Sequence, residues 1–269
     1  MARRDPIGVA RLVVKRVDTR VKRRLKRPAV SVLRSLNWWM RRASAATHRL
    51  QGQVEWRWPP TPEWFDHHVG AQYLGQAERQ NLGEERGVFT NLIVPAGGRV
   101  LDMCCGDGYY SRYFYAHRAE SVVAVDFDPE PIGYARKVNA APNIAYEVRD
   151  VRVSLPDGPF DAVVWNGAIE HFTDDEVAVI LARVRERLSP GGVLAGDTVL
   201  ARSDGSKQLV HHEREYRGER DLLRTLRAVF AHACVWRVEW GRRTELYFYA
   251  SNDEAAIPFA AASGRLVTD

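Results

Sequence analysis

The chain has 269 residues, 45% of them hydrophobic and 27% charged, a composition that excludes a disordered or fibrous protein and suits one globular core. Its net charge of +5 is divided unevenly, because residues 1–50 hold 15 basic and two acidic side chains and the remainder holds 24 basic and 32 acidic ones. Three cysteines without a Cys-x-x-Cys pair argue against a disulfide scaffold, and no stretch approaches the roughly 18 consecutive apolar residues of a membrane span. We therefore expect an acidic cytoplasmic body that carries a basic N-terminal arm.

The first part of the arm has one apolar residue in every four, which is typical of an amphipathic helix. We expect Pro28 to end this helix. The apolar positions are Val9, Val13, Val17, Val21 and Leu25.

A second apolar cluster follows, with Trp38 and Trp39 beside Arg41 and Arg42. Tryptophans next to basic residues are typical of a segment that lies on an anionic membrane. The arm is therefore expected to attach the protein peripherally to the inner membrane face, or to bind a protein partner. A solvated tail, a helix packed on the body and non-specific nucleic-acid binding are the alternatives.

Residues 54–62 contain three prolines in four positions and are expected to form an extended linker. The following region is polar and compatible with helices, and we expect Trp64, Tyr73 and Val88 to be among its buried side chains. Beyond Gly97 the sequence alternates short β-branched runs with segments long enough for helices, which predicts a parallel sheet with helical crossovers. The predicted strands are 99–103, 121–126, 144–148, 160–165 and 192–198.

The strongest local signal is an apolar strand that runs into a glycine turn with Gly106 and Gly108 and then into a helix start. Such a turn lets a ligand approach the backbone and the free amides of the helix. Asp126 ends the next predicted strand, 24 residues after Asp102. An acid at this distance is placed to bind the hydroxyls of a ribose. The nicotinamide fingerprint Gly-x-Gly-x-x-Gly is absent, since Tyr109, Tyr110 and Ser111 follow Gly108.

The segment Leu101–Gly108 resembles the Leu-Asp-x-Gly-Cys-Gly-x-Gly motif of the class I S-adenosylmethionine-dependent methyltransferases, and the resemblance extends over about 95–250. The departure from the motif is Cys104, which stands where the first glycine is customary. The resemblance implies an α/β fold: a Rossmann-like, doubly wound, mostly parallel seven-stranded sheet with a C-terminal antiparallel hairpin at Cys234–Trp240 and Thr244–Ala250. A helical N-terminal extension precedes it.

The same resemblance implies S-adenosyl-L-methionine as the cofactor. It assigns Asp102 to the methionine end, Asp126 to the ribose, and Asp150 to the adenine amino group with Val151 beside the ring. The expected cofactor-binding residues are Asp102, Cys104, Gly106, Gly108, Asp126, Phe127, Asp150, Val151, Asn166 and Tyr73.

Three histidines are candidates for catalysis. His171 follows the fourth predicted strand in a Glu-His pair that the family also shows, and His67 and His68 lie in the region that forms a lid in many relatives. A histidine that caps a helix and a solvated histidine pair are the simpler readings. No metal site is expected, because adjacent residues such as His211 and His212 project differently and lack a regularly spaced third ligand.

The expected reaction is methyl transfer to an O or N atom of a small-molecule or glycan-type acceptor. Asn166–Ile169 lacks the prolines and the aromatic residue of DNA adenine methyltransferases, and no cysteine follows a proline, as cytosine-C5 chemistry requires. An RNA methyltransferase that grips phosphates with the arm and a non-catalytic scaffold are the alternatives. The expected domains are the arm at 1–53, the linker at 54–62, a helical lid or pre-core region at 63–95, the catalytic domain at 96–252 and a tail at 253–269.

Overall fold

The computed structural model describes residues 19–60, 62, 64, 66–67, 83–240 and 243–258. The chain divides into two compact units, Met1–Pro60 and Thr61–Asp269. Among the described residues, no helix is both long and apolar enough to cross a membrane.

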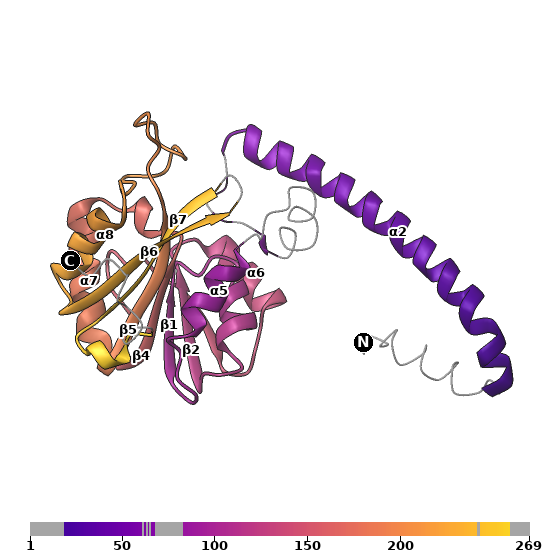
Figure 1. Ribbon diagram of the computed structural model, residues 1–269, viewed down its shortest axis with the longest axis horizontal. Helices are drawn as coiled ribbons and strands as arrows, with labels where there is room; N and C mark the ends of the chain where they lie inside the picture. Colours follow the sequence, from indigo (N-terminus) through magenta and orange to yellow (C-terminus); the bar gives the residue numbers. More distant parts are fainter. Residues whose placement is uncertain are drawn as a thin grey trace. The chain divides into compact units, whose positions relative to one another are not determined.

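The first unit contains one long helix, α2, which runs from Thr19 to Arg57 (Figure 1). The prediction that Pro28 ends a helix is wrong, because Pro28 lies inside α2. A proline removes one backbone hydrogen bond, and no further proline or helix-breaking cluster follows before Pro59. The helix also extends into the predicted linker, so residues 54–57 are helical and not extended. The start of the predicted arm helix, at 9–18, lies outside the described residues.

The second unit is built on a seven-stranded sheet with the order β3-β2-β1-β4-β5-β7-β6. Strands β1 to β5 are parallel, whereas β7 pairs antiparallel with both β5 and β6. This topology confirms the predicted fold class. The strands are β1 (Arg99–Met103), β2 (Ser121–Asp126), β3 (Ile144–Val148), β4 (Phe160–Asn166), β5 (Leu188–Val199), β6 (His232–Trp240) and β7 (Arg243–Ser251).

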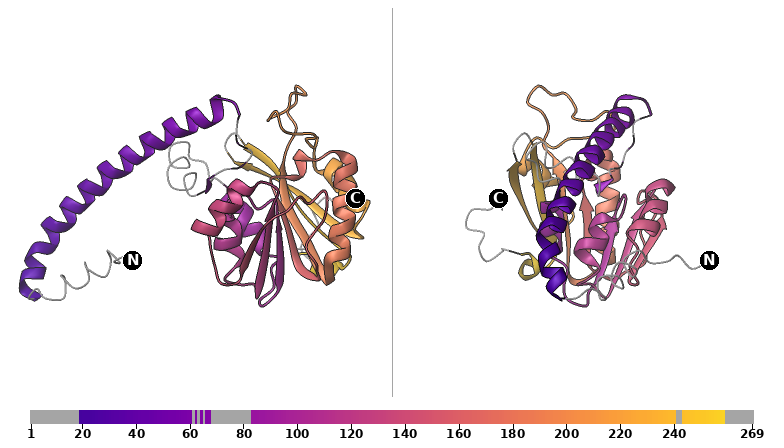
Figure 2. Two further views of the ribbon diagram at one scale, coloured as in Figure 1. Left: turned by 180° about the vertical axis from the view of Figure 1, so that it is seen from behind. Right: turned by 90° about the vertical axis from the view of Figure 1, so that its right-hand side faces the viewer.

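Helices cover both faces of this sheet (Figures 1 and 2). Strand β1 shows why: Leu101 and Met103 point into the core beneath α7 and α8, and Val100 points into the core beneath α5 and α6. Alternate side chains of a strand face opposite sides, so a strand that is buried throughout needs two helical layers. The helices are α5 (Glu84–Asn91), α6 (Pro129–Val138), α7 (Asp174–Arg187) and α8 (Glu219–Arg227), with short turns η2 (Ser111–Tyr115), η3 (Ile169–His171) and η4 (Glu254–Ala256).

Helix α5 differs from its predicted packing. Val88 is 52% exposed, so the prediction that it is buried is wrong. The helix instead turns Glu85, Gly87 and Thr90 inward. A Cβ on Gly87 would lie 2.4 Å from the ring of Phe114, so only glycine allows this close packing.

The carboxyl ends of β1 to β5 all meet at one edge of the sheet. The chain order reverses between β1 and β4, which are neighbours although β2 and β3 lie between them in sequence. In open parallel sheets, ligands bind outside the carboxyl ends of the strands at such a switch point. In this fold, a ligand site is therefore expected at the segments that follow β1 to β5.

Candidate active site

The turn after β1 has a left-handed backbone at three alternate positions. The φ angles are 55° at Cys104, 52° at Gly106 and 72° at Gly108. A Cβ on Gly108 would lie 2.5 Å from the ring of Tyr146, whereas a Cβ on Gly106 would meet nothing closer than Trp64 at 4.0 Å. The turn is therefore packed from behind at Gly108 and has space in front of Gly106. Cys104 is the one non-glycine residue with a positive φ in the described part of the chain, which explains why glycine suits this position.

Asp126 lies beside this turn, at the carboxyl end of β2. Its Oδ2 accepts a hydrogen bond of 3.0 Å from the backbone N–H of Gly106, and its Oδ1 accepts one of 3.0 Å from that of Asp128. The residue is 8% exposed. These contacts hold the carboxylate in one orientation against the open side of the turn.

Asp102 is almost fully buried in β1, and its Oδ2 accepts a hydrogen bond of 2.6 Å from Ser111. Burial raises the pKa of Asp102 to about 7, although the hydrogen bond from Ser111 acts in the opposite direction. A cationic group placed against this carboxylate would favour its ionised form.

A third acid follows β3. Arg152 donates hydrogen bonds to the carboxylate of Asp150 from Nε, at 3.0 Å, and from an amino group, at 2.8 Å, and these bonds hold the pKa of Asp150 below its usual range. The guanidinium of Arg152 also lies 6.0 Å from the ring centre of Phe127, which is half-exposed, and Val151 is buried beside them. The structure thus gathers Phe127, Asp150 and Val151 at one end of the edge. An adenine amino group would have to share Asp150 with Arg152.

Asn166 ends β4, on the other side of β1. Its amide donates a hydrogen bond of 3.1 Å to the hydroxyl of Tyr115, which also contacts Thr90 at 2.7 Å. The Oδ1 atom of Asn166 is buried, and the described part of the chain offers it no hydrogen-bond partner. Buried polar atoms are normally satisfied, so this oxygen indicates a ligand that donates a hydrogen bond.

Of the two histidines in the predicted lid region, the structure describes only His67. His67 is bound to the glycine turn, because its backbone N–H and its Nδ1 atom each lie 2.9 Å from the Asp107 carboxylate. Its ring stacks on Tyr109 with a centroid distance of 5.4 Å. His68 and Tyr73 lie outside the described residues. The structure therefore brings His67 to the turn by an interaction with Asp107 that sequence reasoning missed.

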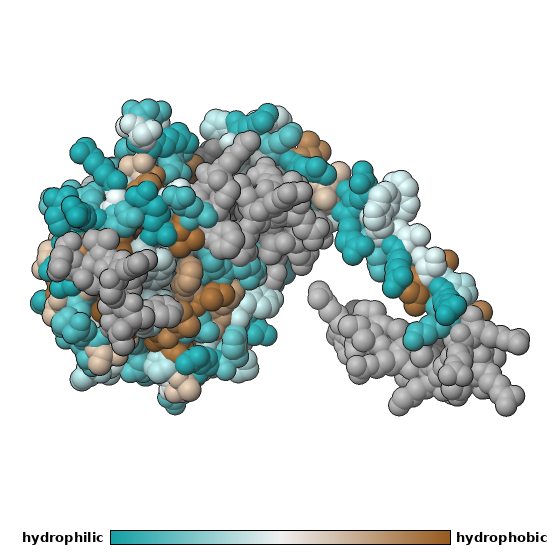
Figure 3. Space-filling view, in the orientation of Figure 1, coloured by the Kyte–Doolittle hydropathy of each residue, from teal (hydrophilic) through white to brown (hydrophobic). Residues whose placement is uncertain are grey.

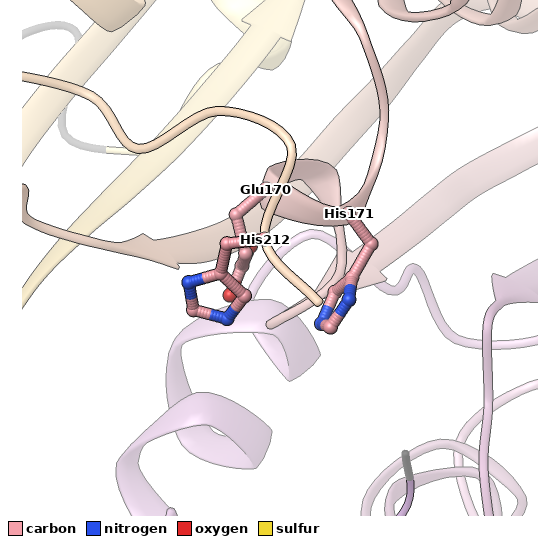
Figure 4. A group of neighbouring side chains, drawn as sticks. All are labelled: Glu170, His171 and His212. Atoms are coloured by element: carbon pink, nitrogen blue, oxygen red, sulfur yellow. The ribbon is translucent and has the colours of Figure 1, made fainter. Parts of the chain in front are cut away.

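His171 lies at the end of η3 with two groups that were not predicted, Glu170 and His212 (Figure 4). Potential ligand atoms of all three residues lie within 4.8 Å of one another. Glu170 and His212 are 2% and 1% exposed, and burial raises the pKa of Glu170. The Glu-His pair signals part of this cluster in the sequence, but nothing in the sequence indicates that His212 folds back on it.

A buried cation, Arg86, lies close to the loop that follows β4. Arg86 of α5 forms ion pairs of 2.9 Å with Asp197 of β5 and 2.5 Å with Glu245 of β7. Burial alone would lower the pKa of Arg86. The attraction of the two carboxylates outweighs this effect and raises the pKa above its usual value. A Cβ on Gly167 would lie 2.7 Å from this guanidinium, so Arg86 also supports the backbone that follows β4.

Comparison with known proteins finds similarity to methyltransferases. Residues 100–192 match the model of a family described as a methyltransferase domain. An uncharacterised methyltransferase of Synechocystis is 36% identical over 118 residues, which cover 42% of this chain and 54% of that protein. A ubiquinone biosynthesis O-methyltransferase of Xanthomonas axonopodis is 35% identical over 38% of this chain and 43% of that protein. The chain thus spans about half the length of curated relatives such as the Synechocystis protein.

Solved structures share the fold. A complex of DhpI with SAH superposes with a TM-score of 0.51 at 21% identity and covers 79% of this chain and 98% of that one. The N-methyltransferase NodS from Bradyrhizobium japonicum, bound to S-adenosyl-L-homocysteine, superposes with a TM-score of 0.51 at 16% identity. The match covers 66% of this chain and 91% of that one. The chain therefore has the fold of these methyltransferases, and its residues 100–192 are similar to a methyltransferase domain.

Proposed function

We propose that the chain binds S-adenosyl-L-methionine and transfers its methyl group to an O or N atom of a small-molecule or glycan-type acceptor. The observation that carries the proposal is the pairing of Asp126 with Gly106, which holds a carboxylate at the open side of a left-handed turn. The cofactor supplies an electrophilic methyl on a sulfonium. The residues of the chain bind and orient the cofactor and the acceptor, and they exclude water from the site.

The residues present fit such a cofactor at each of its ends. In this proposal Asp126 binds the ribose hydroxyls, and Phe127, Asp150 and Val151 contact the adenine. Asp102 and the unsatisfied oxygen of Asn166 suit a cationic donor such as the amino group of the methionine end. Cys104, Gly106 and Gly108 form the turn between these groups, and burial raises the pKa of the Cys104 thiol, which keeps it neutral.

The acceptor would enter beyond β4 and β5. His171 is only partly buried there and lies in a cluster of groups that can accept a proton from an acceptor hydroxyl. His67 fits a positioning residue better, because Asp107 fixes its ring against the glycine turn. An acceptor amine would need only desolvation and orientation, so the O and N alternatives differ in their need for His171.

Calorimetry with S-adenosylhomocysteine tests the cofactor assignment. The wild-type chain should bind it, and Asp126→Ala should weaken binding by at least tenfold, since hydrogen bonds to a charged group contribute roughly 1.5–3 kcal/mol. Asp157→Ala is the matched control, because the side chain of Asp157 is 97% exposed. A wild-type chain that does not bind, or an Asp126 variant that binds like the Asp157 control, would overturn the assignment.

We further propose that α2 attaches the protein to an anionic lipid surface. Between residues 19 and 54 the sequence has ten Lys and Arg and no Asp or Glu. Exposed apolar side chains recur at spacings of three, four and seven residues, so they form one stripe along the helix. In Figure 3, hydrophobic side chains lie next to hydrophilic ones along α2. The stripe consists of Leu25, Val32, Leu36, Trp39, Met40, Leu50 and Val54, all at least 40% exposed.

Three arginines lie on the opposite side of this helix. Arg27, Arg34 and Arg41 follow one another at seven-residue spacing, as Leu25, Val32 and Trp39 do, but two positions further along. Two positions correspond to about 200° around a helix. A helix with this distribution lies in a membrane interface with its apolar face down. Its uniform positive charge favours anionic lipids and disfavours pairing with a second α2.

Sedimentation with vesicles tests the attachment. The chain should bind vesicles that contain phosphatidylserine more strongly than neutral phosphatidylcholine vesicles, and high salt should weaken binding. Val32→Glu should reduce binding by about tenfold or more, whereas Val179→Glu, at a helical and exposed valine of α7, should not. Equal binding to both lipids, or salt-sensitive binding of an RNA oligonucleotide without vesicle binding, would contradict membrane attachment.

A further inference from the structure

The cluster of Glu170, His171 and His212 has the composition of a transition-metal site. Figure 4 shows two imidazoles and a carboxylate drawn from two segments, η3 and the loop that holds His212. Two histidines and one carboxylate form the protein ligand set of many sites that leave a coordination position open. Candidate ligand atoms already lie within 4.8 Å of one another, and tetrahedral coordination at about 2.1 Å requires a separation of about 3.4 Å. Small side-chain rotations would therefore close the site.

His212 and Glu170 have hydrogen-bond partners of the kind that orient metal ligands. The Nδ1 atom of His212 lies 2.5 Å from an oxygen of Glu215, which is buried to a similar extent. A carboxylate on one ring nitrogen fixes the tautomer and leaves the other nitrogen for a metal. Thr198 donates a hydrogen bond of 2.9 Å to Oε2 of Glu170 and so orients the carboxylate.

The backbone joins the two segments of the cluster. The carbonyl oxygen of Glu170 accepts hydrogen bonds from the N–H groups of Glu213, at 2.8 Å, and Arg214, at 3.1 Å. Both donors directly follow His212 in the chain. The loop is therefore fixed to η3 beside the cluster, and the rings of His171 and His212 meet edge to face with centroids 4.9 Å apart. Such preorganisation is what a metal site needs from its protein.

We propose that Glu170, His171 and His212 bind one divalent transition-metal ion, of which zinc is the best match to two imidazoles and a carboxylate. The position of η3 directly after β4 puts this ion on the acceptor side of the sheet edge. The remaining coordination position would take an oxygen of the acceptor, an assignment that rests on the proposed methyl transfer. With the metal bound, His171 would act as a ligand and not as the proton acceptor, and the metal-bound hydroxyl would release its proton to solvent more readily. Its oxygen then bonds to the methyl carbon as the carbon–sulfur bond breaks, and S-adenosylhomocysteine leaves neutral.

Titration calorimetry of the chelator-treated full chain with zinc chloride tests the site without any acceptor. One zinc ion per chain should bind, and magnesium should bind far more weakly, because imidazole ligands favour zinc. His212→Gln and His171→Gln should each weaken zinc binding by more than tenfold. Glu215→Gln should weaken it by about tenfold to a hundredfold, which is typical when the partner of a ligating histidine is lost.

His211→Gln is the matched control, since it changes a histidine of the same loop that is not a member of the cluster. It should bind zinc like the wild type. Circular dichroism of each variant separates loss of the site from loss of the fold. A wild type that binds no zinc, or a His211 variant that loses as much affinity as the folded His171 variant, would overturn the proposal. Binding of S-adenosylhomocysteine is measured separately, so failure of the metal site and failure of the cofactor site give different results.

Discussion

The two sides of the sheet edge are built in different ways. On the side of β1 to β3, Asp102, Asp126 and Asp150 have partners within 20 residues in sequence, as when Asp126 accepts from Gly106 and Asp128. On the side of β4 and β5, the groups come from distant segments, as when Glu170 meets His212. The difference shows that the cofactor side is encoded locally, whereas the acceptor side depends on the complete tertiary structure.

Arg86→Met would change the acceptor side most strongly. Removing this guanidinium leaves Asp197 and Glu245 buried without their shared cation, and breaking such a buried pair costs about 3–5 kcal/mol. Urea unfolding should show this loss, and the exposed Arg118→Met should change stability by less than about 0.5 kcal/mol. An Arg86 variant as stable as the Arg118 control would remove the distinction between a tertiary acceptor side and a local cofactor side.

Asp102→Asn tests the cofactor side. We expect it to stabilise the fold, whereas Arg86→Met destabilises it, and to change the free energy of unfolding by a smaller amount. Because the pKa of Asp102 is raised to about 7, the folded wild type holds a proton that the unfolded chain releases near pH 4. The contribution of Asp102 to the stability of the folded state is complete below pH 4 and is lost as the pH rises through 7. The variant should therefore be more stable than the wild type at pH 8, by roughly 1–3 kcal/mol, and bind S-adenosylhomocysteine more weakly.

Unfolding curves at pH 5 and pH 8 measure this effect, with Asp157→Asn as an exposed control. A gain at pH 8 that disappears toward acid pH identifies the desolvated carboxylate as its source. The same gain at both pH values, or a gain in the Asp157 control, would contradict this explanation.

Cys104→Gly should have the smallest effect. A left-handed conformation costs a non-glycine residue about 1–2 kcal/mol, and the greater backbone entropy of glycine offsets about 0.5–1 kcal/mol of the relief. Thermal unfolding should therefore show a gain of about 0.5 kcal/mol. Cys104→Ala keeps the unfavourable φ angle and should show no gain. Equal stabilisation by glycine and alanine would mean that the thiol, and not the backbone, determines the effect.

The same contrast explains what the sequence could predict. The bounds of β1, β2 and β3 agree with the predicted strands, because β-branched runs and glycine turns are local signals. Strand β5 begins at Leu188, four residues before the predicted start, because strand pairing with Phe160 overrides the tendency of Pro190, Gly191 and Gly192 to form a turn. Long-range pairs leave no such local pattern.

The site follows this rule residue by residue. Asp102 and Asp126 could be found because strand ends and spacing place them. The partners of Arg86 lie on β5 and β7, and the contact of His212 with Glu170 depends on a loop fold, so neither could be found from spacing. Helix α2 is the converse case, since a local rule about proline predicted an end that the helix does not have.

Paired titrations of one protein preparation test most directly whether the edge holds two separate sites. S-adenosylhomocysteine and zinc are titrated into the wild type, Asp126→Ala and His212→Gln. We predict that Asp126→Ala loses affinity for S-adenosylhomocysteine and keeps zinc binding, and that His212→Gln does the reverse. Parallel loss of both ligands in either folded variant, or binding of neither ligand by the wild type, would contradict a cofactor side and an acceptor side that bind independently.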